Sequence, residues 1–189
     1  INPTGRKILA AELEAGNFST VERDVMVQVA TGANILDINA GVVYNSNPNP
    51  NYTEPPLMKQ MIELVQKLSD IPLCIDSSVP AALEMGLKTA NGRPLLNSVT
   101  GEEDRLDFIL PLVKKYNVPV VAISNDDSGI SEDPDVRFDV ARKIVERASD
   151  FGIPTCDIVV DPLVMPIGAM PSAGHQVFTL IRKLRQELG

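Results

Sequence analysis

Several residue types on which common enzyme chemistries depend are scarce in this sequence of 189 residues. Tryptophan is absent and aromatic residues make up 4% of the chain, which argues against stacking platforms for single-stranded nucleic acid. The single histidine, His175, falls at the start of a helical pattern beyond the last expected strand, so a histidine-based nucleophilic triad is excluded. Every lysine falls in a helical pattern and none ends a strand, which disfavours Schiff-base catalysis.

Cysteine, positive charge and long apolar runs are also in short supply. Cys74 and Cys156 form no C-x-x-C motif, so we expect buried reduced thiols and a cytoplasmic location. A net charge of −8 with scattered Lys and Arg argues against nucleic-acid binding. No apolar run approaches the roughly 20 residues of a membrane span, and the first residues do not resemble a signal peptide. We therefore expect a protein that binds neither nucleic acid nor a membrane.

What the sequence does contain is a repeated pattern of short apolar runs that stop on Asp or Asn. Each run reads as a buried parallel strand, and a helical pattern follows it. The expected strands cover residues 34–39, 73–76, 95–98, 118–123 and 158–160. Residues 1–5 read as the tail of a further strand. Strands that alternate with helices predict a parallel sheet with right-handed crossovers.

Two α/β architectures fit this alternation, a doubly wound open sheet and a TIM (β/α)₈ barrel. No glycine-rich phosphate loop follows any expected strand, which weakens the doubly wound alternative. Polar residues end almost every strand, as in barrel enzymes, which draw site residues from many strand ends. We therefore favour a single barrel domain over residues 1–189. It is incomplete as written, and we expect the first strand and the last one or two strands to lie outside this sequence.

Two helix starts can be read from local turn chemistry. The pattern predicts that Thr53, Pro55 and Pro56 open the helix that follows the first full strand. It also predicts that Ser77 or Ser78 caps the helix near Pro80.

The strand-end side chains are the candidate site. Asp161, Asp76 and Asn97 are the strongest candidates, because an acid or amide directly after buried apolar residues is costly without a partner. A salt bridge to a helix Arg, a helix cap or a simple turn would also explain them. Asn39 and Asn125 are weaker candidates, since Asn is an ordinary turn former. Grouped acids could hold Mg²⁺, but no D-x-D motif ends a strand and no His joins them, so we expect no metal.

These residues describe a bowl of carboxylates and amides at one end of a sheet. Its expected apolar floor consists of Leu163, Val164, Met165 and Ile167. Such a bowl has no strong nucleophile of its own. It suits a flat heterocycle rich in hydrogen-bond donors, with the chemistry supplied by the ligand or a cofactor.

The ordered set of strand-end motifs resembles the pterin-binding barrel family, and within it most of all the methyltetrahydrofolate:corrinoid (iron-sulfur) protein methyltransferases. The motifs are ILDINAG at 35–41, LCIDS at 73–77, LNSVTG at 96–101 and DPL at 161–163. The resemblance covers essentially the whole chain. It implies a TIM barrel in which Asp76, Asn97 and Asp161 hold the pterin ring, with Asn2 at the rim after the first strand.

The resemblance also implies a reaction and its partners. A methyl group would move between N5 of tetrahydrofolate and the cobalt of a corrinoid (cobalamin) carried by a partner protein, as part of one-carbon metabolism. The family's catalytic Asn lies on a seventh strand, beyond Gly189, and the family implies a cytoplasmic homodimer. Two alternatives stay open, namely an enzyme like dihydropteroate synthase and a non-catalytic folate-binding or scaffold module.

Overall fold

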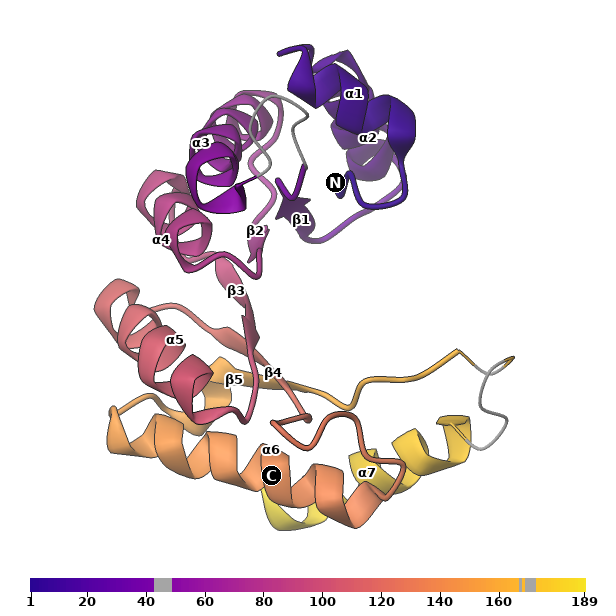
Figure 1. Cartoon of the computed structure of the whole chain (residues 1–189), viewed down its shortest axis with the longest axis vertical. Helices are drawn as coiled ribbons and strands as arrows, with labels where there is room; N and C mark the ends of the chain where they lie inside the picture. Colours follow the sequence, from indigo (N-terminus) through magenta and orange to yellow (C-terminus); the bar gives the residue numbers. More distant parts are fainter. Residues whose placement is uncertain (43–48, 167, 169–172) are drawn as a thin grey trace. The chain divides into compact units, whose positions relative to one another are not determined.

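The computed structural model of the chain describes residues 1–42, 49–166, 168 and 173–189. Within these residues the chain forms five short strands that alternate with α-helices (Figure 1). The elements are α1 (Lys7–Glu14), α2 (Ser19–Ala30), β1 (Leu36–Asn39), α3 (Pro50–Leu68), β2 (Leu73–Asp76), α4 (Pro80–Thr89), β3 (Leu95–Val99), α5 (Glu103–Tyr116), β4 (Val120–Ile123), α6 (Pro134–Asp150), η1 (Thr155–Asp157), β5 (Ile158–Asp161) and α7 (Ala173–Glu187). The predicted α/β alternation is confirmed, and each predicted strand is present.

The chain divides into two compact units, Ile1–Asn97 and Ser98–Gly189. In the first unit β1, β2 and the start of β3 pair in parallel, in chain order. The start of the chain also lies along β1, because Asn39 N donates to Ile1 O at 3.0 Å and Ile1 N donates to Asp37 O. This alternating pattern is the ladder of a parallel neighbour, as the strand-tail prediction required.

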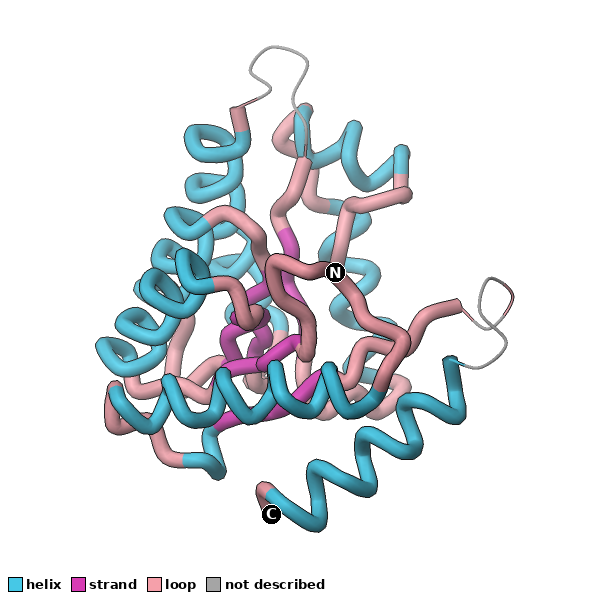
Figure 2. The backbone as a smooth tube through the Cα atoms, turned by 60° about the horizontal axis from the view of Figure 1, so that its bottom comes forward, coloured by secondary structure: helices cyan, strands magenta, loops and turns pink. Residues whose placement is uncertain are grey.

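Side chains of the first unit sort by the two-residue period of its strands. Leu36, Ile38, Ile75 and Leu96 are fully buried. Helices α2, α3 and α4 pack against one another in chain order, and α3 and α4 contact the strands. Figure 1 shows α3 beside α4, and Figure 2 distinguishes helices (cyan) from strands (magenta). The three helices contribute the apolar residues Val21, Val25, Met58, Met61, Ile62, Val65, Ala82 and Leu83. The residues between the buried strand positions therefore point to the opposite face, which carries the polar strand ends.

The predicted start of α3 is wrong in detail, whereas α4 begins at Pro80, as predicted, but with a different N-cap. Helix α3 begins at Pro50, where Asn49 Oδ1 accepts a hydrogen bond from Asn51 N at 3.1 Å, so Pro55 and Pro56 lie inside the helix. A cap decides where a helix begins, and the two prolines only remove backbone donors from it. Helix α4 has Val79 as its N-cap, with no side-chain cap. Ser77 Oγ instead accepts from Val79 N at 2.8 Å, which shapes the turn before the helix.

The second unit repeats the arrangement with β4 and β5, which pair in parallel. Val120 and Ala122 are buried, and Ile158 and Val160 stand opposite them in the register. Helix α6 packs against α5 and α7 and against β4 (Figure 1). Lys183 on α7 pairs with Asp135 on α6 at 2.7 Å and lies over the Phe138 ring. Among the described residues, no helix combines the length and apolar character that crossing a membrane requires.

Gly86 on α4 tests how closely the helices pack on the strands. A Cβ added there would lie 2.4 Å from Ile75 Cγ2 and 3.4 Å from both Ile62 Cδ1 and Met58 Cγ. We expect Gly86→Ala to lower the free energy of unfolding by about 1–3 kcal/mol in urea denaturation, because overpacking outweighs the better helix propensity of Ala.

Gly174 on α7 is the matched control for Gly86. Nothing lies within 4 Å of a Cβ added there. Gly174→Ala should therefore stabilise the protein by up to about 1 kcal/mol. Equal effects of the two substitutions on the unfolding midpoint would contradict the packing described for α4.

Candidate functional site

Three polar side chains form a row across the ends of β1, β2 and β3. Asn39 stands opposite Asp76, and Asp76 stands opposite Asn97, in a parallel register with neighbouring strands about 4.8 Å apart. All three are half-buried, on the face opposite the helix-packed core. Ile1 bonds to the residues on either side of Ile38, so Asn2 follows at the end of β1 beside this row. The structure thus brings together four of the six predicted site residues within one unit.

Asn39 orients the carboxylate of Asp76. Its Nδ2 donates to Asp76 Oδ2 at 2.8 Å, and its Oδ1 accepts from Gly41 N at 2.8 Å. These two bonds distinguish the two ends of the Asn39 amide, since only nitrogen can donate and only oxygen can accept. A carboxylate has about four acceptor positions, so one bond from Asn39 leaves Asp76 with capacity for donors of a ligand.

Asn2 has a local role. Its Oδ1 accepts from Thr4 N at 2.8 Å, which closes a tight turn at the rim. Asn97 contributes its backbone to the same edge, because Asn97 O accepts from Ser77 N at 3.2 Å. Contacts of either side chain with a ligand remain predictions.

One step further from the strand ends, Asp37 lies beside Cys74 in the register. Burial raises the pKa of the Cys74 thiol far above its ordinary value, and the neighbouring charge of Asp37 and a hydrogen bond to it raise the pKa further. Cys74 is therefore a neutral thiol at physiological pH and no nucleophile. It is buried as predicted, whereas Cys156 is exposed, so the prediction of two buried thiols is wrong for Cys156.

A buried acid that sequence reasoning missed contacts Ser77, the residue after Asp76. Glu54 on α3 is 4% exposed and accepts a hydrogen bond from Ser77 Oγ. Burial raises the pKa of Glu54, the charge of Asp76 raises it further, and the bond from Ser77 opposes the rise. The signal that could have found it is an acid among helix residues that otherwise face the core.

Burial and a neighbouring acidic charge also raise the pKa of Asp76. Burial raises its pKa above the ordinary value, the hydrogen bond from Asn39 lowers it, and the charge of Asp37 raises it again. The charge of Asp37 thus disfavours the charged form of Asp76, and the charge of Asp76 disfavours the charged form of Glu54. Hydrogen-bond donors or positive charge on a ligand would relieve this repulsion, which makes the row suited to a donor-rich molecule.

In the second unit Asp161 ends β5 and is held by its backbone and its side chain. Asp161 O accepts from Ser124 N at 3.2 Å and from Ser124 Oγ at 3.0 Å. Asp161 Oδ1 accepts from Leu163 N at 2.7 Å, which closes the turn after the strand. Ile123 stands opposite Asp161 in the register, and Ser124 is buried at the end of β4.

Asn125 acts through its backbone. Asn125 O accepts from Gly101 N at 2.8 Å, and a Cβ on Gly101 would meet Val140 Cγ1 at 2.6 Å and Asp126 Cβ at 3.2 Å. The loop after β3 therefore approaches the loop after β4 closely only because residue 101 is glycine. Next to it, bonds from Ser128 to the Asp126 carboxylate lower the pKa of Asp126. A ligand contact of the Asn125 side chain remains a prediction.

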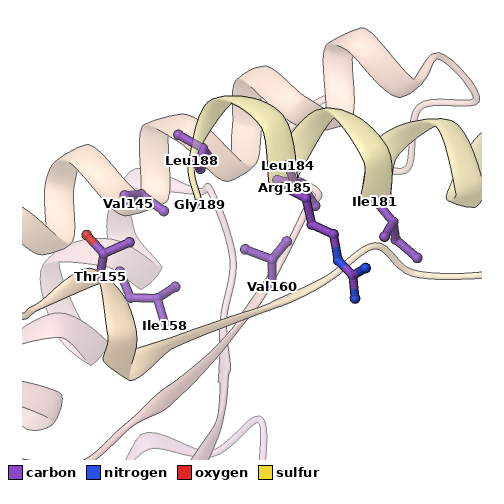
Figure 3. Close-up of a pocket in the computed structure, with 9 residues that line it drawn as sticks. All are labelled: Val145, Thr155, Ile158, Val160, Ile181, Leu184, Arg185, Leu188 and Gly189. Carbon is purple, nitrogen blue, oxygen red and sulfur yellow. The ribbon is translucent and has the colours of Figure 1, made fainter.

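The expected apolar floor is partly wrong. Val164 is 60% exposed, while Leu163 and Met165 are half-buried and Ile167 lies outside the described residues. The second unit does contain an apolar hollow of about 230 Å³, between β5, α6 and α7 (Figure 3). Its lining includes Ile158 and Val160. By the strand period these point away from Asp161, so this hollow is not the predicted site.

Within the described ranges, no three Asp, Glu, His or Cys side chains gather in a way that could hold a metal ion. The polar row is an array of hydrogen-bond acceptors and amides.

Comparison with known proteins adds a family and a fold. The family described as "Pterin binding enzyme" matches residues 1–189. The methylcorrinoid:tetrahydrofolate methyltransferase of Eubacterium limosum is 26% identical over 162 residues, covering 85% of this chain and 57% of that protein. The methionine synthase of Mycobacterium leprae (strain TN) is 24% identical, and the match covers 98% of this chain and 16% of the relative. The chain thus spans little more than half of the first relative.

Dihydropteroate synthases are among the solved structures with the same fold. The enzyme from Vibrio fischeri ES114 superposes with a TM-score of 0.62 at 16% identity, over 90% of this chain and 64% of that one. The enzyme from Xanthomonas albilineans, in complex with 7,8-dihydropteroate, has a TM-score of 0.62 at 18% identity, over 86% of this chain and 58% of that one. At these identities the likeness establishes the fold alone, which is part of a (β/α) barrel, as predicted.

The buried acid Glu54 predicts a pH-dependent effect on stability. Below the ordinary pKa of 4.5, Glu54 is neutral in both the folded and the unfolded chain, so burying it carries no charge penalty. As pH rises through its raised pKa in the folded protein, the penalty appears and stability is lost. We expect Glu54→Gln to leave stability nearly unchanged at pH 4 and to raise it at pH 8, measured by urea unfolding.

Glu63 on the same helix is the control. Its side chain is 47% exposed and pairs with Lys59, so Glu63→Gln should show no such growth in stability between the two pH values. A Glu54→Gln effect that is equal at both pH values would show that burial does not disfavour the charged form of Glu54.

Proposed function

The chain belongs to the pterin-binding enzyme family, and from this premise we propose that it binds a reduced folate and transfers a methyl group between N5 of tetrahydrofolate and the cobalt of a corrinoid. The corrinoid is carried by a partner protein and acts as a substrate. The observation that carries the proposal is the row of Asn39, Asp76 and Asn97, in which an amide orients a half-buried carboxylate at a strand end.

The chemistry of a pterin edge fits this row. The 2-amino group and N3–H of a pterin are parallel donors, which a carboxylate accepts as it accepts the two N–H groups of an arginine fork. Asp76 supplies such a carboxylate. Because burial raises its pKa, hydrogen-bond donors on a ligand would stabilise its charged form. Asn97 supplies both a donor and an acceptor for the remaining polar atoms of the ring. The family resemblance assigns a further contact to Asp161.

The proposed reaction needs no covalent intermediate on the protein. When bound, a reduced corrinoid supplies the nucleophile, so the neutral Cys74 and the absence of a histidine triad are no obstacle. The chain's own residues hold the pterin ring and keep N5 in place. Release of methyl requires positive character on N5, and the family resemblance assigns help with that charge to an Asn on a seventh strand. The homology to a methylcorrinoid:tetrahydrofolate methyltransferase supports this reaction over others in the family.

Folate binding is tested by calorimetric titration of the full chain with 5-methyltetrahydrofolate. We expect saturable binding that weakens at least about tenfold in Asp76→Asn and in Asp161→Ala, because each loses a carboxylate acceptor. Asp127→Asn, at an exposed position in the turn after β4, should change the affinity by less than about twofold. A folded protein that does not bind the folate would refute the proposal.

The reaction is tested by adding reduced cobalamin to the folate complex. We expect the methyl group to be transferred to cobalt, which is monitored by the change in absorbance of the cobalamin. At subsaturating folate, the rate of transfer should fall at least about tenfold in Asp76→Asn. Turnover of a pterin pyrophosphate with p-aminobenzoate would instead identify a dihydropteroate synthase. Folate binding without either reaction would identify a non-catalytic folate-binding module.

A further inference from the structure

The turn after β5 holds an unfavourable backbone conformation. Leu163 has φ of +53°, in the left-handed region that residues other than glycine rarely adopt. In this conformation Leu163 N donates to Asp161 Oδ1 at 2.7 Å. The direction of the Asp161 carboxylate therefore depends on a strained turn, and such strain persists only where surrounding groups hold it.

Arg137 is the group that holds this turn. It lies on α6, is 1% exposed, and its Nη1 donates to Pro162 O at 2.9 Å and to Leu163 O at 3.0 Å. Its Nε donates to Ser131 O, in the segment before α6. The planar guanidinium fixes the directions of these donors, so the carbonyls at 162 and 163 are fixed relative to α6.

The partners of Arg137 show what the side chain is for. A buried arginine usually pairs with a carboxylate, since an unpaired charge is costly to bury. These bonds of Arg137 go instead to backbone carbonyls of two loops, and Nη2 has no partner among the described residues. An apolar side chain would fill the same space at lower cost. The guanidinium is thus explained by the N–H donors that it supplies to the loop carbonyls.

We propose that Arg137 is a positioning residue that sets the ligand-binding carboxylate of Asp161 by fixing the Asp161-Pro162-Leu163 turn. The inference rests on the proposed function, in which Asp161 contacts the pterin. Ser124 holds the carbonyl of Asp161 from β4, and Arg137 holds the next two carbonyls from α6. The carboxylate itself is then aimed by Leu163 N.

The experiment compares Arg137→Lys with Arg142→Lys in the full chain. A lysine keeps the charge but lacks the planar fork. Arg142 is on the same helix, is half-exposed, pairs with Asp139 and Glu146, and lies over the Phe138 ring, away from the turn after β5. We expect Arg137→Lys to weaken 5-methyltetrahydrofolate binding about tenfold and to speed hydrogen exchange of the Leu163 amide, with neither change in Arg142→Lys.

A double-mutant cycle separates positioning from a general structural role. If Arg137 acts through Asp161, adding Arg137→Lys to Asp161→Ala should weaken binding by less than about twofold more. Independent, multiplying effects would overturn the proposal, as would a folded Arg137→Lys protein that binds the folate like the wild type. If Arg137→Lys does not fold, Arg137→Met keeps the buried stem, and failure of both variants to fold would reject the positioning role.

The outcomes also separate this inference from the proposed function. Wild-type protein that binds no folate refutes the proposed function, and the inference with it. Wild-type protein that binds, together with an Asp161→Ala effect and an unchanged Arg137→Lys protein, refutes the role of Arg137 alone.

Discussion

The parallel register of short strands, with its two-residue alternation of side chains, is the constraint on which the site depends. Leu36, Ile38 and Ile75 must be buried against helices, so Asn39 and Asp76 point to the other face at the same level. The apolar positions therefore decide where the polar ones stand. A slip of one residue in any strand would exchange the two faces and bury the carboxylate in the core.

The two predicted pterin carboxylates are held by different means. Asp76 is oriented by a side-chain amide from the neighbouring strand, and burial together with the charge of Asp37 raises its pKa. Asp161 is oriented by a backbone amide two residues further on, inside a turn that a buried arginine fixes. The first arrangement depends on sheet register, and the second depends on a long-range contact between a helix and a loop.

The strands and their polar ends could be predicted because both depend on local patterns in the sequence. Asn39 was predicted as a weak candidate, and the structure gives it a definite task as the partner of Asp76. The bonding partners of Glu54 and Arg137 could not be predicted, since they lie 23 residues away at Ser77 and 25 residues away at Pro162. Composition and spacing carry no information about which distant groups a buried charge will meet.

By itself, the sequence determined the α/β alternation, the polar character of the strand ends and the family. The first two follow from residue order within single segments, and the family follows from the order of motifs along the chain. The tertiary structure alone decided that the buried Glu54 meets Ser77 next to Asp76, and that Arg137 on α6 bonds to the turn after Asp161. These features arise from packing, in which burial sets the cost of each charge and geometry selects its partner.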